Sequence, residues 1–136
     1  MMDSGIVLDS FAVLAYLQGG KGAQQVKELL RQAANGKLAV QMTVINLGEV
    51  YYITSRAYGQ ERAEEVLAML RHLPIKLVAA DEELALETAR IKAKHTISYA
   101  DAFAVALALR NGVPVVTGDP EFSCIETLVP VKWLEK

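Results

Sequence analysis

The sequence predicts an α/β fold in which a central parallel sheet is enclosed by helices on both faces, a three-layer α/β/α sandwich. Short apolar runs rich in β-branched residues alternate along the chain with longer segments of helical periodicity. This alternation is typical of parallel sheets built from βαβ units. Hydrophobic residues make up 52% of the chain, which fits strands buried on both faces. The length suits one hydrophobic core, so we expect a single domain over residues 1–136.

The chain is predicted to begin with a strand and two helices. The apolar run 5–10 indicates a buried strand, and either Asp9 or Ser10 is suited to cap the helix that follows over 11–17. The glycine-rich stretch 18–22 ends that helix. A second helix is expected over 23–35, and Asn35-Gly36 is suited to end it with a left-handed cap.

The middle of the chain predicts a strand followed by two more helices. The strand covers residues 38–41, and Thr43 is a good N-cap for a helix over 44–58. Gly59 closes that helix. A further helix is expected over 60–73, where Pro74 stops it.

The last part of the chain continues the alternation. Residues 75–79 predict a third strand, and Asp81 caps a helix that runs to about Lys94. An apolar helix around Asp101 ends at Asn111-Gly112 and leads into a strand over 114–117. Residues 128–131 indicate a short final strand, and the proline within it places this strand at an edge of the sheet.

Charge and cysteine content exclude several classes of protein. The formal net charge of −2 gives no global positive field that would point to a nucleic-acid partner, but acids gathered in one site would leave the remaining surface nearly neutral. A single cysteine excludes an intrachain disulfide and a cysteine-based zinc site. No apolar run reaches transmembrane length and the N-terminus lacks signal-peptide features, so we expect a soluble cytoplasmic protein without a membrane partner.

Four carboxylates lie next to predicted strand ends or helix starts. Asp9 ends the first strand, Glu49 lies on the helix after the second, Asp101 opens a late helix and Asp119 follows the strand 114–117. Right-handed crossovers bring such positions to one edge of a parallel sheet, where ligands bind in open α/β folds. Carboxylate oxygens suit a hard cation, which can orient a water and stabilise charge on a phosphodiester.

Three of these acids also have an ordinary structural role open to them. Asp9 is suited to cap a helix. Asp101 follows Ser98 by three residues, as in a capping box. Asp119 lies in a Gly-Asp-Pro sequence that is typical of turns. From the residues alone, the carboxylate cluster is therefore a hypothesis beside these local roles.

Glu49 and two hydroxyl residues leave similar alternatives open. Glu49 is either solvated or paired with Asn46 at i, i+3, but the apolar residues around it predict a mostly buried helix, in which an acid needs a partner. Ser10 and Thr117 each neighbour a candidate acid and are suited to hydrogen-bond a carboxylate, a water or a phosphate. Their alternative roles are a helix cap for Ser10 and an ordinary strand position for Thr117.

Four segments in this order resemble the PIN domain family and, within it, the VapC-like toxins of toxin–antitoxin pairs. The segments are Ile6-Val7-Leu8-Asp9-Ser10, Val44-Ile45-Asn46-Leu47-Gly48-Glu49-Val50-Tyr51, Ile97-Ser98-Tyr99-Ala100-Asp101-Ala102-Phe103 and Val115-Val116-Thr117-Gly118-Asp119-Pro120-Glu121-Phe122. No single segment is specific, but the ordered set is, and it spans nearly the whole chain.

The resemblance implies a fold, an activity, a cofactor and partners. The fold is a parallel α/β/α sandwich, and the activity is that of a ribonuclease dependent on Mg²⁺ or Mn²⁺. The partners are RNA, a second copy of the chain in a homodimer, and a small VapB-like antitoxin whose C-terminal segment occludes the site. The implied catalytic and metal-binding residues are Asp9, Glu49, Asp101 and Asp119, with supporting roles for Ser10 and Thr117 and an outer metal-ligand role for Glu121.

We therefore expect a metal-dependent endoribonuclease, in the toxin role rather than in housekeeping RNA processing because the sequence is a bare domain without an appended module. A non-catalytic PIN-like module that binds a partner protein is the rival from another class. A phosphate-binding receiver domain is a third, but it would normally have paired acids early in the chain and a lysine after a late strand. Here Asp9 has no acidic neighbour, and no lysine lies beside Thr117 or Asp119.

Overall fold

A computed structural model describes residues 4–135, so the predicted domain ends at 1 and 136 lie outside the described residues. Its sheet has five strands in the order β3-β2-β1-β4-β5, and every neighbouring pair is parallel. The strands are β1 (Gly5–Leu8), β2 (Ala39–Thr43), β3 (Lys76–Val78), β4 (Val115–Thr117) and β5 (Val131–Trp133). The predicted parallel sheet is confirmed.

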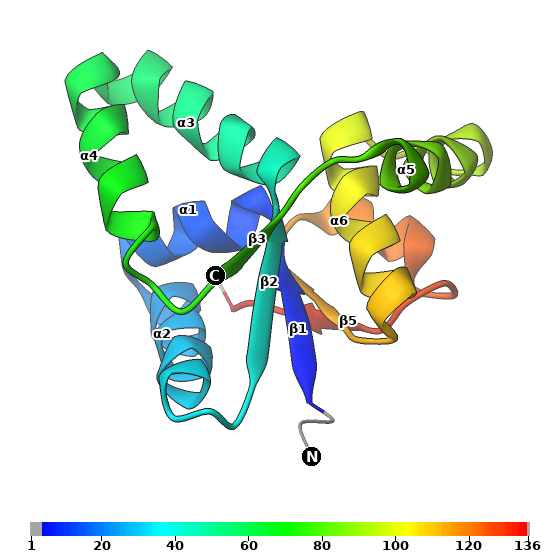
Figure 1. The fold of residues 1–136 in the computed structure, drawn as a ribbon, viewed down its shortest axis with the longest axis horizontal. Coiled ribbons are helices and arrows are strands. Elements are labelled where there is room, and N and C mark those ends of the chain that lie inside the picture. Colours follow the sequence, from blue (N-terminus) through cyan, green and yellow to red (C-terminus); the bar gives the residue numbers. More distant parts are fainter. Residues whose placement is uncertain (1–3, 136) are drawn as a thin grey trace.

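Helices cover both faces of this sheet (Figure 1). Four of them pack on one face and the remaining two, with a short 3-10 helix, on the other. The helices are α1 (Ser10–Gln18), α2 (Lys21–Ala34), α3 (Val44–Tyr58), α4 (Gln60–Leu70), α5 (Glu82–Lys94) and α6 (Tyr99–Asn111), and the 3-10 helix is η1 (Pro120–Ile125). The three-layer α/β/α architecture follows from this arrangement.

Alternating side chains of the central strands build the two halves of the core. Ile6 and Leu8 of β1 face the layer of α1 to α4, while Val7 faces α5 and α6. In β4, Val116 faces the layer of α1 to α4, and Val115 faces α5 and α6. Successive strand residues point to opposite faces, so an apolar strand serves both layers at once.

Helix caps hold the starts of the helices at the carboxyl ends of the strands. Asp9 caps α1 through Oδ1, which accepts the Ala12 N–H at 2.8 Å, and this settles the choice between Asp9 and Ser10. Thr43 caps α3, and Gly36 follows α2 with a positive φ of 74°. Each of these ends therefore agrees with the sequence prediction.

The predicted elements differ from the structure mainly near the C-terminus. The predicted strand 128–131 is wrong in position: the residues that pair with β4 are Val131–Trp133. Pro130 lacks an N–H, and its carbonyl instead accepts the Val115 N–H at 3.1 Å, just before β5 begins. The helix η1 was not predicted, and α4 ends at Leu70 rather than at residue 73.

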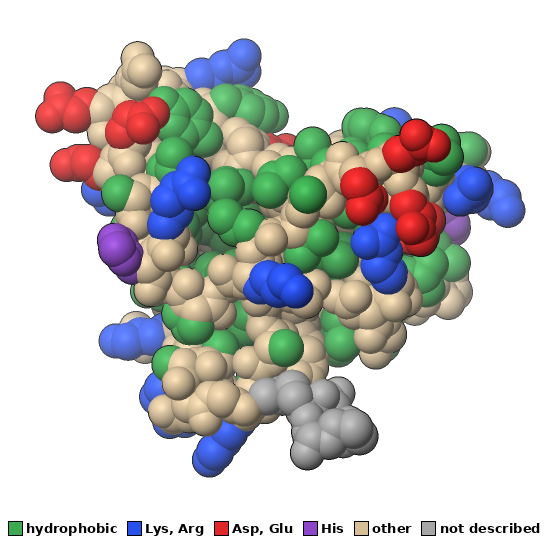
Figure 2. Space-filling view, viewed as in Figure 1, with side chains coloured by type: hydrophobic (Ala, Val, Ile, Leu, Met, Phe, Trp, Pro, Cys, Tyr) green, Lys and Arg blue, Asp and Glu red, His purple; other side chains and the backbone are tan. Residues whose placement is uncertain are grey.

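The surface carries its charges in scattered groups. Figure 2 shows one face on which red acidic side chains lie over α4 and over α5, and on which blue basic side chains are dispersed rather than gathered. Green hydrophobic side chains fill much of the hollow between the two red groups. Within residues 4–135, none of the helices combines the length and apolar character needed to span a membrane.

Candidate active site

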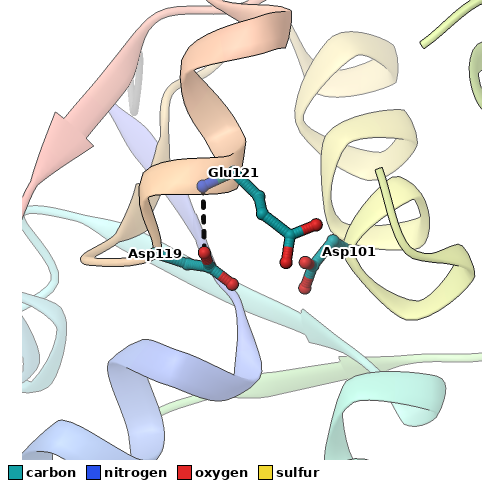
Figure 3. A group of neighbouring side chains, drawn as sticks. All are labelled: Asp101, Asp119 and Glu121. Atoms are coloured by element: carbon teal, nitrogen blue, oxygen red, sulfur yellow. Dashed lines mark hydrogen bonds between the residues drawn. The ribbon is translucent and has the colours of Figure 1, made fainter. Parts of the chain in front are cut away.

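The predicted acids lie at the edge of the sheet formed by the carboxyl ends of the strands. Asp101 comes from the first turn of α6, Asp119 directly follows β4, and Glu121 lies in the first turn of η1. Each offers an oxygen, and these oxygens all lie within 4.8 Å of one another. Figure 3 shows the Glu121 carboxylate turned toward Asp101, with Asp119 beneath the start of η1. These three residues form what we call the acidic triad.

Asp9 lies beside the triad and is completely buried. Its Oδ1 caps α1, but its Oδ2 has no hydrogen-bond partner among the described residues. Burial is the main cause that raises the pKa of Asp9 to about 7; the charges of Asp101 and Asp119 act in the same direction, while the Thr117 hydroxyl and the Ala12 N–H lower the pKa. A buried oxygen without a partner is costly, so this side of Asp9 is suited to a ligand.

Asp101 combines a local structural role with a strained electrostatic position. The side chain of Ser98 caps α6 and accepts the Asp101 N–H at 3.1 Å, which is one of the two bonds of a capping box. Only 8% of Asp101 is exposed. Burial raises the pKa of Asp101 to about 6, with further contributions from Asp119, Glu49 and Glu121, while the Ser98 side chain lowers it. The cap of α6 uses the backbone N–H of Asp101, whereas the acidic triad uses its carboxylate, so one residue serves in both.

Asp119 and Glu121 are linked through the backbone of η1. Asp119 Oδ1 accepts the Glu121 N–H at 3.0 Å and caps this helix, while Thr117 Oγ1 accepts the Asp119 N–H at 3.0 Å. Pro120 occupies the first helical turn, where its missing N–H costs nothing. The turn expected at Gly-Asp-Pro is therefore the start of a helix that presents two carboxylates.

Glu49 reaches the same edge from α3 through a different partner from the one expected. Ser10 Oγ donates to Glu49 Oε1, whereas Asn46 bonds elsewhere. The predicted mostly buried helix is wrong, because α3 and α4 stand out from the sheet and leave residues such as Tyr52 about half exposed (47%) (Figure 1). Glu49 itself is half-buried.

The structure therefore separates the predicted site residues into three groups. Asp101 and Asp119 join Glu121, which the family resemblance implied only as an outer ligand, in the acidic triad. Asp9 and Glu49 lie outside that triad, but the charges of Asp101 and Asp119 act on Asp9, and the charge of Glu49 acts on Asp101. Ser10 and Thr117 are buried and hydrogen-bond within this region rather than to solvent.

The sequence analysis missed the contacts of Asn46. Its side chain is fully buried and bonds to Ser10 and to the Ala100 carbonyl, which lie 36 and 54 residues away in the chain. The only signal in the sequence was its spacing of three residues from both Thr43 and Glu49. That spacing correctly indicates the Thr43 contact, since the Asn46 N–H donates to Thr43 Oγ1 at 3.1 Å.

The donor set fits a hard divalent cation. All five acids at this edge offer carboxylate oxygens, the ligands that Mg²⁺ and Mn²⁺ prefer. Within residues 4–135, no lysine or arginine forms an ion pair with any of them. The unpartnered Asp9 Oδ2 and the raised pKa values of Asp9 and Asp101 are the expected signs of negative charge that lacks a counter-ion. The residues present are therefore compatible with such a cation.

Fold and site together define an α/β/α protein with an acidic cluster at the carboxyl edge of a parallel sheet. The family model described as PIN domain matches residues 6–127 of the chain. The chain therefore belongs to the PIN domain family. A sequence comparison with curated proteins gives no match.

Solved structures with a similar fold include several toxin–antitoxin proteins. VapBC2 from Rickettsia felis, bound to a DNA fragment from its promoter, gives a TM-score of 0.73 at 14% identity, covering 96% of this chain and 99% of the other. DNA-bound VapBC from Salmonella typhimurium gives 0.71 at 19% identity, with 95% and 97% covered. VapC20 from Mycobacterium tuberculosis, a sarcin-ricin loop cleaving toxin, gives 0.68 at 21% identity, with 88% and 93% covered. At these identities the similarity establishes the fold.

Proposed function

We propose that this chain is a divalent-cation-dependent endoribonuclease that acts as the toxin of a VapBC-type toxin–antitoxin pair. The observation that carries the proposal is the convergence of Asp101, Asp119 and Glu121 within 4.8 Å, beside the unpartnered Asp9 Oδ2. Membership in the PIN domain family supports it, as does the similarity of the fold to toxins such as VapC20 of M. tuberculosis. A cytoplasmic location belongs to the same proposal.

Mg²⁺ or Mn²⁺ would be held by the acidic triad, with Asp9 and Glu49 beside it. When bound, the cation supplies Lewis-acid stabilisation of charge on a phosphodiester and lowers the pKa of a water. Without it, the carboxylates repel the phosphate backbone of RNA, so cleavage should depend strictly on the cation.

The chain's own groups prepare the attack on the phosphodiester. Asp101 is slightly exposed and lies within the triad, which supports a role in which one of its carboxylate oxygens orients an attacking water and accepts its proton. Ser10 holds Glu49, and the cap at Ser98 holds the backbone of Asp101. The water oxygen would bond to phosphorus while the bond from phosphorus to the 3′ oxygen breaks and that oxygen takes up a proton. The products are a 5′-phosphate and a 3′-hydroxyl.

The test is cleavage of a structured RNA pool by the purified protein with Mg²⁺, with Mn²⁺ and with EDTA. The Asp101→Asn variant should lose cleavage by about 100-fold or more, since the substitution removes both a ligand charge and the proton acceptor. The matched control is Asp81→Asn, which changes an exposed Asp that likewise lies at a helix start, where it caps α5. Equal cleavage by Asp101→Asn and the parent would contradict the proposal.

We place the antitoxin that this proposal requires in a groove between α1, α3 and α4. The groove has a volume of about 460 Å³ and is lined by the apolar side chains of Leu14, Leu17 and Val66 together with Gln18, Thr54, Tyr58 and Arg62. Tyr58 is 72% exposed, which is unusual for a large aromatic side chain without a partner. An amphipathic segment of a VapB-like antitoxin is suited to such a groove. A homodimer of the toxin is part of the same proposal.

Coexpression with any short open reading frame found next to the gene tests this partner. The proposal expects a stable complex in which RNA cleavage is suppressed, and Tyr58→Asp should weaken the complex while leaving cleavage by the free protein intact. Cleavage that is unaffected by the neighbouring product would favour a housekeeping RNA-processing role instead.

A further inference from the structure

The side-chain amide of Asn46 joins three of the elements that surround the carboxylates. Asn46 lies in the first turn of α3 and is fully buried. Its Nδ2 donates to Ser10 Oγ at 3.3 Å, at the start of α1, and to the carbonyl oxygen of Ala100 at 3.1 Å, in the first turn of α6. Both amide hydrogens therefore reach other helices, and none is left for local bonding.

Thr43 fixes the orientation of this amide. The Asn46 N–H donates to Thr43 Oγ1 at 3.1 Å, and the Thr43 hydroxyl donates its own proton to Asn46 Oδ1 at 2.6 Å. Because Oδ1 is thereby an acceptor, the amide nitrogen must face Ser10 and Ala100. Thr43 is the last residue of β2, so the amide is anchored to the sheet.

This orientation sets the direction of the hydrogen bond to Glu49. Ser10 Oγ accepts from Asn46, so the Ser10 hydroxyl proton is free to donate, and it donates to Glu49 Oε1. A chain of donors thus runs from Thr43 through Asn46 and Ser10 to the Glu49 carboxylate. Without Asn46, the Ser10 hydroxyl could rotate, and Glu49 would lose a fixed donor.

The second hydrogen bond of the Asn46 amide holds the backbone next to Asp101. Ala100 directly precedes Asp101 in α6, and its carbonyl receives a donor from α3. Hydrogen bonds within a helix do not fix its distance from a neighbouring helix. The bond from Asn46 to Ala100 does, because it joins the first turn of α3 to the first turn of α6. Asp101 extends from this turn of α6 and Glu49 from the following turn of α3, and the charge of Glu49 acts on Asp101.

We propose that Asn46 is a positioning residue of the cation site, which holds Glu49 and Asp101 in their places without itself contacting the cation. The inference rests on the proposed function. Side chains that orient metal ligands in this way typically change metal affinity or activity by 10- to 100-fold when they are removed. A purely structural role would instead change the melting temperature and leave the metal affinity of the folded protein unchanged.

The test measures Mn²⁺ affinity by calorimetry for the full chain and for Asn46→Ala, with RNA cleavage by the parent measured in parallel. We expect Asn46→Ala to bind Mn²⁺ about 10- to 100-fold more weakly than the parent. The matched control is Thr54→Ala, which truncates another buried polar side chain on the same helix, two turns further from the start of α3. This control should bind Mn²⁺ as the parent does.

Ser10→Ala provides a second variant that removes a single hydroxyl and keeps the cap formed by Asp9. It should also weaken Mn²⁺ binding. Since Asn46 acts partly through Ser10, the double variant should lose less affinity than the product of the two single losses. If Asn46→Ala fails to fold, Ser10→Ala tests the route through Ser10, because parent-like Mn²⁺ affinity in that variant overturns the role of Asn46 in holding Glu49.

The outcomes separate this inference from the function on which it rests. Parent-like Mn²⁺ affinity in a folded Asn46→Ala variant overturns the role of Asn46 and leaves the nuclease proposal standing. A parent that neither binds Mn²⁺ nor cleaves RNA overturns both.

Discussion

The Glu121 N–H donates to Asp119 Oδ1 at 3.0 Å, and this bond brings two carboxylates of one short helix to face the carboxylate of another (Figure 3). The cap fixes the start of η1, and the carboxylate of the exposed Glu121 is turned toward Asp101. One local hydrogen bond thereby adds a third acid to a pair that the strand ends and helix starts already bring together.

The first prediction concerns Glu121, which should bind the cation directly. Glu121→Gln removes one of three converging charges, so Mn²⁺ affinity should fall by about tenfold while the fold is kept, since this side chain is exposed. Glu61→Gln, at an exposed acid on α4, is the control and should leave the calorimetric titration unchanged. An unchanged affinity in Glu121→Gln would limit the site to the other acids.

The second prediction concerns the pH dependence of stability in EDTA. Burial raises the pKa of Asp9 from 3.8 to about 7, so between these values the folded protein binds more protons than the unfolded chain. The free energy of unfolding should therefore fall as the pH rises from 4 to 7 and level off above that. Asp101, with a pKa of about 6, contributes in the same direction.

Asp9→Asn isolates the contribution of Asp9 to this pH dependence. Asparagine retains the cap of α1 but carries no charge, so at pH 8 in EDTA the variant should be more stable than the parent, by an amount on the order of 4 kcal/mol. The stability difference should vanish near pH 4. Urea unfolding across this pH range measures it, and Asp81→Asn, at an exposed cap, should show no such difference. A variant less stable than the parent at pH 8 would contradict the unfavourable charge on Asp9.

The third prediction concerns the contact between Gly118 and Phe11. A Cβ at residue 118 would approach Phe11 Cε1 to 2.4 Å, and two further ring atoms to 3.0 and 3.1 Å. Gly118→Ala should therefore displace the partly exposed ring and destabilise the protein by about 1 kcal/mol. Phe11→Ala should remove this penalty, so denaturant unfolding of the two single variants and the double variant should show strong coupling. If the changes in unfolding free energy of the two single variants add up in the double variant, the Phe11 ring is not what disfavours a side chain at residue 118.

Local sequence patterns were sufficient for most of the fold. Apolar runs and helical periodicity predicted the order and type of the first four strands and the six α-helices, because the caps and glycines at their ends act locally. The helix η1 was missed although Asp119 followed by Pro120 is a start signal, since the segment is too short to show periodicity. The last strand was misplaced because Pro130 interrupts the run just before the pairing begins.

The position of the acids at one edge of the sheet was predictable, but the hydrogen bonds that connect them to other elements were not. Asp9, Asp101 and Asp119 follow from the rule that strand ends and helix starts share one edge. The contact of Asn46 with Ala100 spans 54 residues and depends on how α3 and α6 pack, so spacing along the chain carries no sign of it. For the same reason, the sequence left Glu49 either solvated or paired with Asn46 on its own helix, whereas Ser10 from α1 is its partner.

The most direct test of the cation site is anomalous scattering from a crystal grown with Mn²⁺. The acidic triad predicts a strong anomalous peak among the carboxylate oxygens of Asp101, Asp119 and Glu121, lost in crystals of Asp101→Asn. A crystal at saturating Mn²⁺ with no peak at this edge of the sheet would contradict the cation-dependent nuclease proposal.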